Sequence, residues 1–123
     1  METIGHRLMR QIQALHIEPA QAQDTADRMR YIAQVVAGTR TVLASLEDYA
    51  WPDLVGSQAQ MRWALRIRRK QLEKGIYELI VRSMKLPQTA LLAEKLNTLF
   101  QQSSATFWIN HRDDPFSALL LAV

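Results

Sequence analysis

The chain has 123 residues, of which 48% are hydrophobic and 22% are charged. This composition is typical of a folded domain and excludes a chain that is disordered throughout. The absence of cysteine excludes disulfides and thiolate metal sites. No apolar run approaches the ~20 residues that a membrane span needs, and the first residues do not resemble a signal peptide. We therefore expect one cytoplasmic domain, residues 1–123, that binds no membrane.

Turn-forming residues are scarce, with four glycines and four prolines. Few turns in a chain of this length imply long elements. Alanine, leucine, glutamine, arginine and methionine are frequent, and these residues favour helix over strand. The sequence therefore predicts an all-α fold, an antiparallel bundle of four main helices plus a short C-terminal helix.

The first two predicted helices cover residues 3–16 and 20–50, with Pro19 between them. In the first helix one apolar stripe recurs at helical spacing and is formed by Ile4, Leu8, Ile12 and Leu15. In the second, steps of three and four residues form a near-heptad seam, which is typical of a helix packed along its length. The seam consists of Met29, Ile32, Val36, Thr39, Leu43, Leu46 and Ala50.

A third helix is expected to begin at Asp53 or Ser57, either of which could cap it, and to run to about Lys85. Its expected core face contains Met61, Leu65, Leu72, Ile76 and Leu79.

A fourth helix should begin near Pro87 and end at Gln102 or Ile109. Its expected inner face is formed by Leu92, Leu96, Leu99 and Ser103. Asp114 as the cap and Pro115 at the first helical position predict a last, short helix over 116–122.

Positive charge is concentrated in the third helix. Residues 57–85 contain eight basic residues against Glu73 and Glu78, a net charge of +6 where the whole chain has +3. At about 100° per residue, five cations share one arc beside the apolar face. These five are Arg62, Arg66, Arg69, Lys70 and Lys74, with Trp63 at the edge. The other three lie off the arc and are expected to be structural or to pair with acidic residues of the second helix: Arg68, Arg82 and Lys85.

Three interpretations of this arc stay open. It could bind the phosphates of a nucleic acid, with Trp63 stacking on an unpaired base. It could contact an acidic protein. It could also be a solvated helix face, because arginine is a good helix former whose stem covers apolar surface. A backbone or single-strand contact fits better than duplex sequence recognition, because no helix-turn-helix pair is evident.

The C-terminal segment has no charged residue after Asp114. Phe116, Leu119 and Leu120 recur at helical spacing. They could fold back to complete the core, or they could dock on a partner or on a second copy.

No constellation in the sequence indicates catalysis, a metal or a cofactor. His111 with Asp113 and Asp114 is the one cluster of a histidine with carboxylates, and no nucleophile accompanies it. We expect a non-enzymatic binding protein, an accessory subunit of a nucleoprotein assembly. The alternative is an adaptor, chaperone or inhibitor that docks on an acidic or apolar partner.

Overall fold

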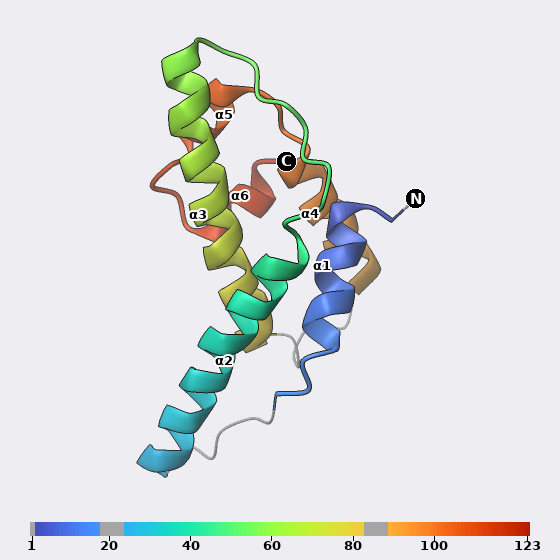
Figure 1. Ribbon diagram of the computed structural model, residues 1–123, viewed down its shortest axis with the longest axis vertical. Helices are drawn as coiled ribbons and strands as arrows, with labels where there is room; N and C mark the ends of the chain where they lie inside the picture. Colours follow the sequence, from blue (N-terminus) through green and yellow to red (C-terminus); the bar gives the residue numbers. More distant parts are fainter. Residues whose placement is uncertain (1, 18–23, 83–88) are drawn as a thin grey trace.

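The computed structural model describes residues 2–17, 24–82 and 89–123 (Figure 1). Within them the chain is all-α and has no strand, so the predicted fold class is confirmed. The first four helices alternate in direction, and two short helices lie beside α3 (Figure 1). The helices are α1 (Ile4–Gln13), α2 (Thr25–Ser45), α3 (Gln58–Arg82), α4 (Thr89–Phe100), α5 (Ala105–Asn110) and α6 (Phe116–Leu121).

Helix α1 begins as the sequence predicts, because the Thr3 hydroxyl accepts a hydrogen bond from the His6 backbone N–H at 3.3 Å. The whole predicted stripe faces the core, with its last residue half-buried. The helix ends at Gln13 rather than at His16, which adopts a positive φ of 50° and turns the chain. Pro19 lies outside the described residues.

Helix α2 is shorter than predicted, and its core-facing side differs from the predicted seam. Val35 and Val42 are buried, and they lie about one residue's rotation away from the seam. Three seam residues, Thr39, Leu43 and Leu46, are also buried. The remaining seam residues are exposed, so the prediction of a seam packed along its full length was wrong; they are Met29, Ile32, Val36 and Ala50.

Helix α3 begins with a reciprocal cap between Ser57 and Gln60. The Ser57 hydroxyl accepts from the Gln60 N–H at 3.2 Å, and the Gln60 side chain accepts from the Ser57 N–H at 3.0 Å. Ser57, not Asp53, is therefore the cap. Leu65 is 48% exposed, which corrects its predicted core position, because the core side of this part of α3 is formed by Ala64 and Ile67. Further along, Leu72, Ile76 and Leu79 are buried as predicted.

A buried glutamine ties α3 to the segment that joins α5 to α6. Gln71 is only 1% exposed, and its amide nitrogen donates to the carbonyls of His111, Arg112 and Asp114 at 3.2, 3.4 and 3.2 Å. A buried amide with several partners fixes the backbone around it. Residues 111–114 are thereby held against the middle of α3.

The predicted fourth helix is divided into two helices. Helix α4 ends at Phe100, and the Ser104 hydroxyl caps α5 by accepting from the Phe107 N–H at 3.4 Å. The indole of Trp108 donates to the Gln102 carbonyl at 2.9 Å and so satisfies a carbonyl left by the break. Leu96 and Leu99 are buried as predicted. Ser103 is exposed, because it lies beyond the end of α4. Pro87 lies outside the described residues.

Helix α6 is not capped in the predicted way. The Asp114 carboxylate lies 2.6 Å from Nδ1 of His111, so it does not cap the helix. Pro115 takes the cap position, without a side-chain hydrogen bond, instead of the first helical position.

Candidate functional site

The five cations that the sequence places on one arc lie on the outer face of α3. We call Arg62, Arg66, Arg69, Lys70 and Lys74 the basic stripe. The first four are exposed and the last is half-buried. Since an α-helix rises 1.5 Å per residue, the stripe is about 18 Å long. The regular helix thus presents the charges as one row rather than as scattered side chains.

The charges of the basic stripe are not neutralised within the described part of the chain. None of its five members makes an ion pair there, whereas Arg7, Arg10, Arg30 and Arg112 each do. Glu73 lies within the stripe, yet none of the five cations comes within ion-pair distance of it. A row of unpaired, hydrated cations can bind an anionic partner without first breaking an internal contact.

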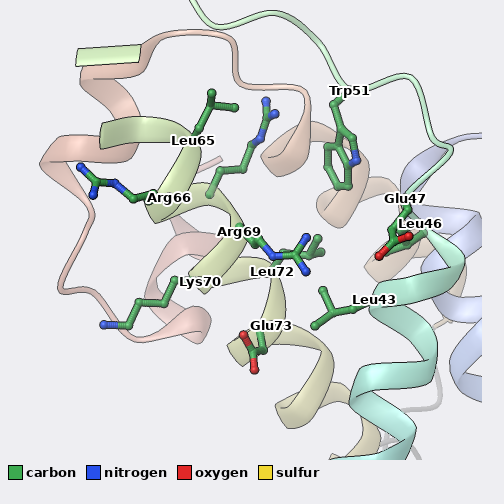
Figure 2. Close-up of a pocket in the computed structure, with 11 residues that line it drawn as sticks. Leu43, Leu46, Glu47, Trp51, Leu65, Arg66, Arg69, Lys70, Leu72 and Glu73 are labelled. Atoms are coloured by element: carbon green, nitrogen blue, oxygen red, sulfur yellow. The ribbon is translucent and has the colours of Figure 1, made fainter. Parts of the chain in front are cut away.

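The side chains of the basic stripe point in two directions (Figure 2). Arg66 and Lys70 point away from α2, toward solvent. Arg69 points toward α2, into a groove of about 730 Å³. Trp51 and Leu65 contribute apolar surface to this groove, and two carboxylates also line it, those of Glu47 and Glu73. The outer side of α3 therefore presents positive charge alone, while the groove side presents both signs of charge.

Arg68 is separated from the stripe, as the sequence predicts, and is 8% exposed. Its guanidinium donates to the Pro52 carbonyl at 3.0 Å and lies 5.2 Å from the centre of the Trp51 ring. Burial lowers the pKa of Arg68, and the nearby Asp53 carboxylate opposes that change. Its partners thus belong to the segment that follows α2, which agrees with the predicted structural role rather than with the alternative of pairing with acids of α2.

Two residues that were not among the predicted ones, Arg112 and Tyr77, lie beside the basic stripe. Arg112, from the segment after α5, lies over the Trp63 ring with its guanidinium carbon 5.3 Å from the centroid. Because the two residues are far apart in the sequence, no local pattern predicts this contact. Tyr77 is 38% exposed and Trp63 is 43% exposed. Trp63 and Tyr77 lie fourteen residues apart, which is nearly four helical turns, so both rings lie on the same side of α3. This spacing could have been read from the sequence.

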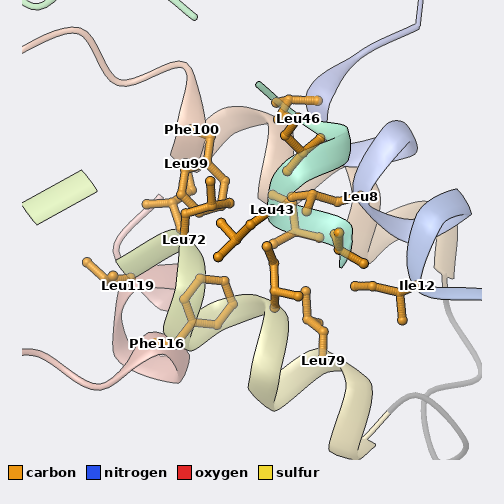
Figure 3. Close-up of a cluster of buried hydrophobic side chains, with 14 of the residues drawn as sticks. Leu8, Ile12, Leu43, Leu46, Leu72, Leu79, Leu99, Phe100, Phe116 and Leu119 are labelled. Carbon is orange, nitrogen blue, oxygen red and sulfur yellow. The ribbon is translucent and has the colours of Figure 1, made fainter. Parts of the chain in front are cut away.

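The predicted C-terminal docking residues lie elsewhere. Phe116 and Leu119 are buried and point into the central apolar cluster (Figure 3). Leu120 is half-buried against the same core. These side chains therefore complete the core, which agrees with the first of the two predicted alternatives and corrects the second, an exposed docking face. Of the two other off-arc cations, Arg82 is exposed and Lys85 lies outside the described residues.

In the described chain, the one histidine–carboxylate pair near the site lies in the segment after α5. His111 pairs with Asp114, and within residues 2–17, 24–82 and 89–123 no three histidine or carboxylate side chains gather as metal ligands would. No helix in those ranges combines the length and apolarity required to cross a bilayer. No protein-family model matches the sequence, and no curated protein or solved structure matches it either.

Proposed function

We propose that this chain is a non-enzymatic binding protein that holds a nucleic-acid backbone on the basic stripe of α3. The observation that carries the proposal is the row of five cations without an ion pair in the described chain. Contacts of lysine and arginine with phosphates supply affinity through counterion release and little sequence information. A protein of this kind would serve as an accessory subunit of a nucleoprotein assembly.

A single strand suits this surface better than a duplex. Trp63 is 43% exposed at one end of the stripe, and unpaired bases stack on such rings. Phosphates would follow the outer side, where Arg66 and Lys70 point (Figure 2). Helix α3 is also buried along its opposite side, so it is not a detached recognition helix that could enter a major groove.

A second candidate is an acidic, amphipathic protein segment, with this chain acting as an adaptor, chaperone or inhibitor. The observation that favours it is the groove beside the stripe, where Leu65 is 48% exposed beside Trp51 and Arg69. Apolar side chains of a helix could sit in that groove while its carboxylates meet the cations.

The deciding experiment is a titration of labelled single-stranded and duplex oligonucleotides at several salt concentrations. We expect preferential single-strand binding whose logarithmic salt slope is about −3.5, as five phosphate contacts predict. The test variant Arg66→Glu/Arg69→Glu/Lys70→Glu should abolish binding. The matched control makes the same change of charge at exposed cations outside the stripe: Arg10→Glu/Arg28→Glu/Arg82→Glu.

Three results would contradict the proposal. They are no binding at low salt, an affinity that does not depend on salt, and equal losses in the two triple variants. The groove separates the two candidates, because Leu65→Asp should leave oligonucleotide binding intact. If the wild type fails to bind oligonucleotides but binds an acidic amphipathic model peptide in a manner that Leu65→Asp abolishes, the second candidate replaces the first.

A further inference from the structure

Helix α2 has two apolar faces, and the described part of the chain buries only one of them. Val35, Val42 and Leu46 form the buried face. The other face begins with Met29, Ile32 and Val36, which are 67%, 51% and 37% exposed. A helix with apolar residues on two sides ordinarily packs on both. The second face is therefore a surface without a partner in the described chain.

Within the described residues, the amino-terminal half of α2 packs on the core mainly through the half-buried Tyr31. No residue from 25 to 34 is buried, and this part of the helix projects beyond the other helices (Figure 1). Isolated helices shorter than about 12–15 residues are marginal in water, because packing supplies most helical stability. A helix of this kind gains stability when its exposed apolar side is covered.

Helix α3 continues the exposed face. Tyr77 and Val36 line one groove of about 520 Å³ between α2 and α3, and Val81 lies one turn beyond Tyr77 with 42% of its surface exposed. The apolar surface thus crosses two helices. Its extent is that of an interaction surface rather than of one stray side chain.

The charges around this groove indicate what covers it. Its walls carry three cations and two carboxylates, a nearly balanced mixture, from Arg40, Lys70, Lys74, Glu73 and Glu78. A twofold interface brings a patch against itself, so it needs both signs of charge in one patch.

We propose that a second copy of this chain covers the face formed by Met29, Ile32, Val36, Tyr77 and Val81. The two α2 helices would pack antiparallel across a twofold axis near Ile32. Each projecting helix would then receive an apolar partner that the described residues of its own chain do not provide. This interface differs from the C-terminal one expected from the sequence, and it does not depend on nucleic-acid binding.

Sedimentation of the purified chain without nucleic acid tests the proposal. We expect a reversible, concentration-dependent dimer. Ile32→Asp should weaken it by more than about a hundredfold, because the twofold axis buries the new carboxylate twice. Leu91→Asp is the matched control, since Leu91 is 52% exposed on α4 and should leave the dimer unchanged. Circular dichroism verifies that both variants keep their helices.

Cross-linking provides a second, independent measurement. The natural chain has no cysteine, so one introduced thiol reports one position. Ala33→Cys lies beside the proposed axis and should form a disulfide-linked dimer on mild oxidation. Ala90→Cys, exposed on α4, should form no disulfide-linked dimer under the same oxidation. A non-reducing gel separates the linked dimer from the single chain. A wild type that stays monomeric at every concentration, or a dimer that Leu91→Asp disrupts as strongly as Ile32→Asp, would overturn the proposal.

Discussion

The guanidinium of Arg68 lies 5.2 Å from the centre of the Trp51 ring and anchors the segment between α2 and α3. The same group donates to the Pro52 carbonyl at 3.0 Å. Two neighbouring arginines on one helix therefore have different roles. Arg68 fixes the entry to α3, whereas Arg69 presents its charge in the groove beside α2 (Figure 2).

Replacing Arg68 by methionine should reduce the free energy of unfolding by about 2 kcal/mol. The substitution keeps an apolar stem but removes the cation–π contact and leaves the Pro52 carbonyl without its donor. Urea denaturation measures the change. Arg69→Met is the control and should be nearly neutral for stability, because Arg69 is exposed. Equal effects of the two substitutions would disprove the structural role of Arg68.

Gly75 should not tolerate alanine. A Cβ atom at this position would overlap the ring of Phe116, which is 2% exposed and has no room to move. Overpacking of this kind costs about 1–3 kcal/mol, and a lower melting temperature will report it. Gly38→Ala is the matched comparison. Its Cβ would meet only the ends of flexible side chains, and alanine improves a helix interior, so stability should hold or rise.

The C-terminal helix is expected to behave as core. Phe116→Ala should destabilise the protein by about 3–5 kcal/mol, as for other large buried side chains. Leu121→Ala should have little effect, because Leu121 is 83% exposed. Chemical denaturation of both variants checks this expectation. If Phe116→Ala kept wild-type stability, the core role of this helix would be contradicted and the docking alternative would be favoured.

Trp63 provides a prediction for binding. If an unpaired base stacks there, Trp63→Leu should weaken single-strand binding by about 1–3 kcal/mol and leave the salt slope unchanged, because no phosphate contact is lost. Fluorescence anisotropy of a labelled oligonucleotide measures both quantities. Val55→Leu, also at an exposed apolar residue but away from the stripe, serves as the control. A changed salt slope with unchanged affinity at low salt would rule out stacking.

The sequence predicts well those features that depend on neighbouring residues. The cap at Ser57, the apolar stripe of α1 and the separation of Arg68 from the basic stripe all follow from helical spacing and local hydrogen bonding. The periodicity of α2 was more ambiguous, because two apolar faces overlap in it. Spacing alone could not show that the face containing Val35, rather than that containing Ile32, would meet the core.

Contacts between residues far apart in the chain could not be predicted from the sequence. Nothing near Gln71 indicates that its amide binds three carbonyls of residues 111–114, and nothing near Trp63 indicates that Arg112 covers it. Asp114 is a further example. Its residue type predicts a helix cap, but its carboxylate pairs with His111 instead. Such contacts are decided by tertiary packing, which overrides local preference.

The close approach of α1 to α4 has a consequence for the order of folding. Gly5 packs directly against the Ala93 carbonyl, so the two backbones touch where any larger residue would separate them. During synthesis α1 emerges long before α4, and its apolar stripe stays without that partner until α4 leaves the ribosome. Contacts between such distant segments slow folding and leave apolar surface open to aggregation meanwhile. Helix α1, although it is made before α4, can therefore reach its final place only after α4 has formed.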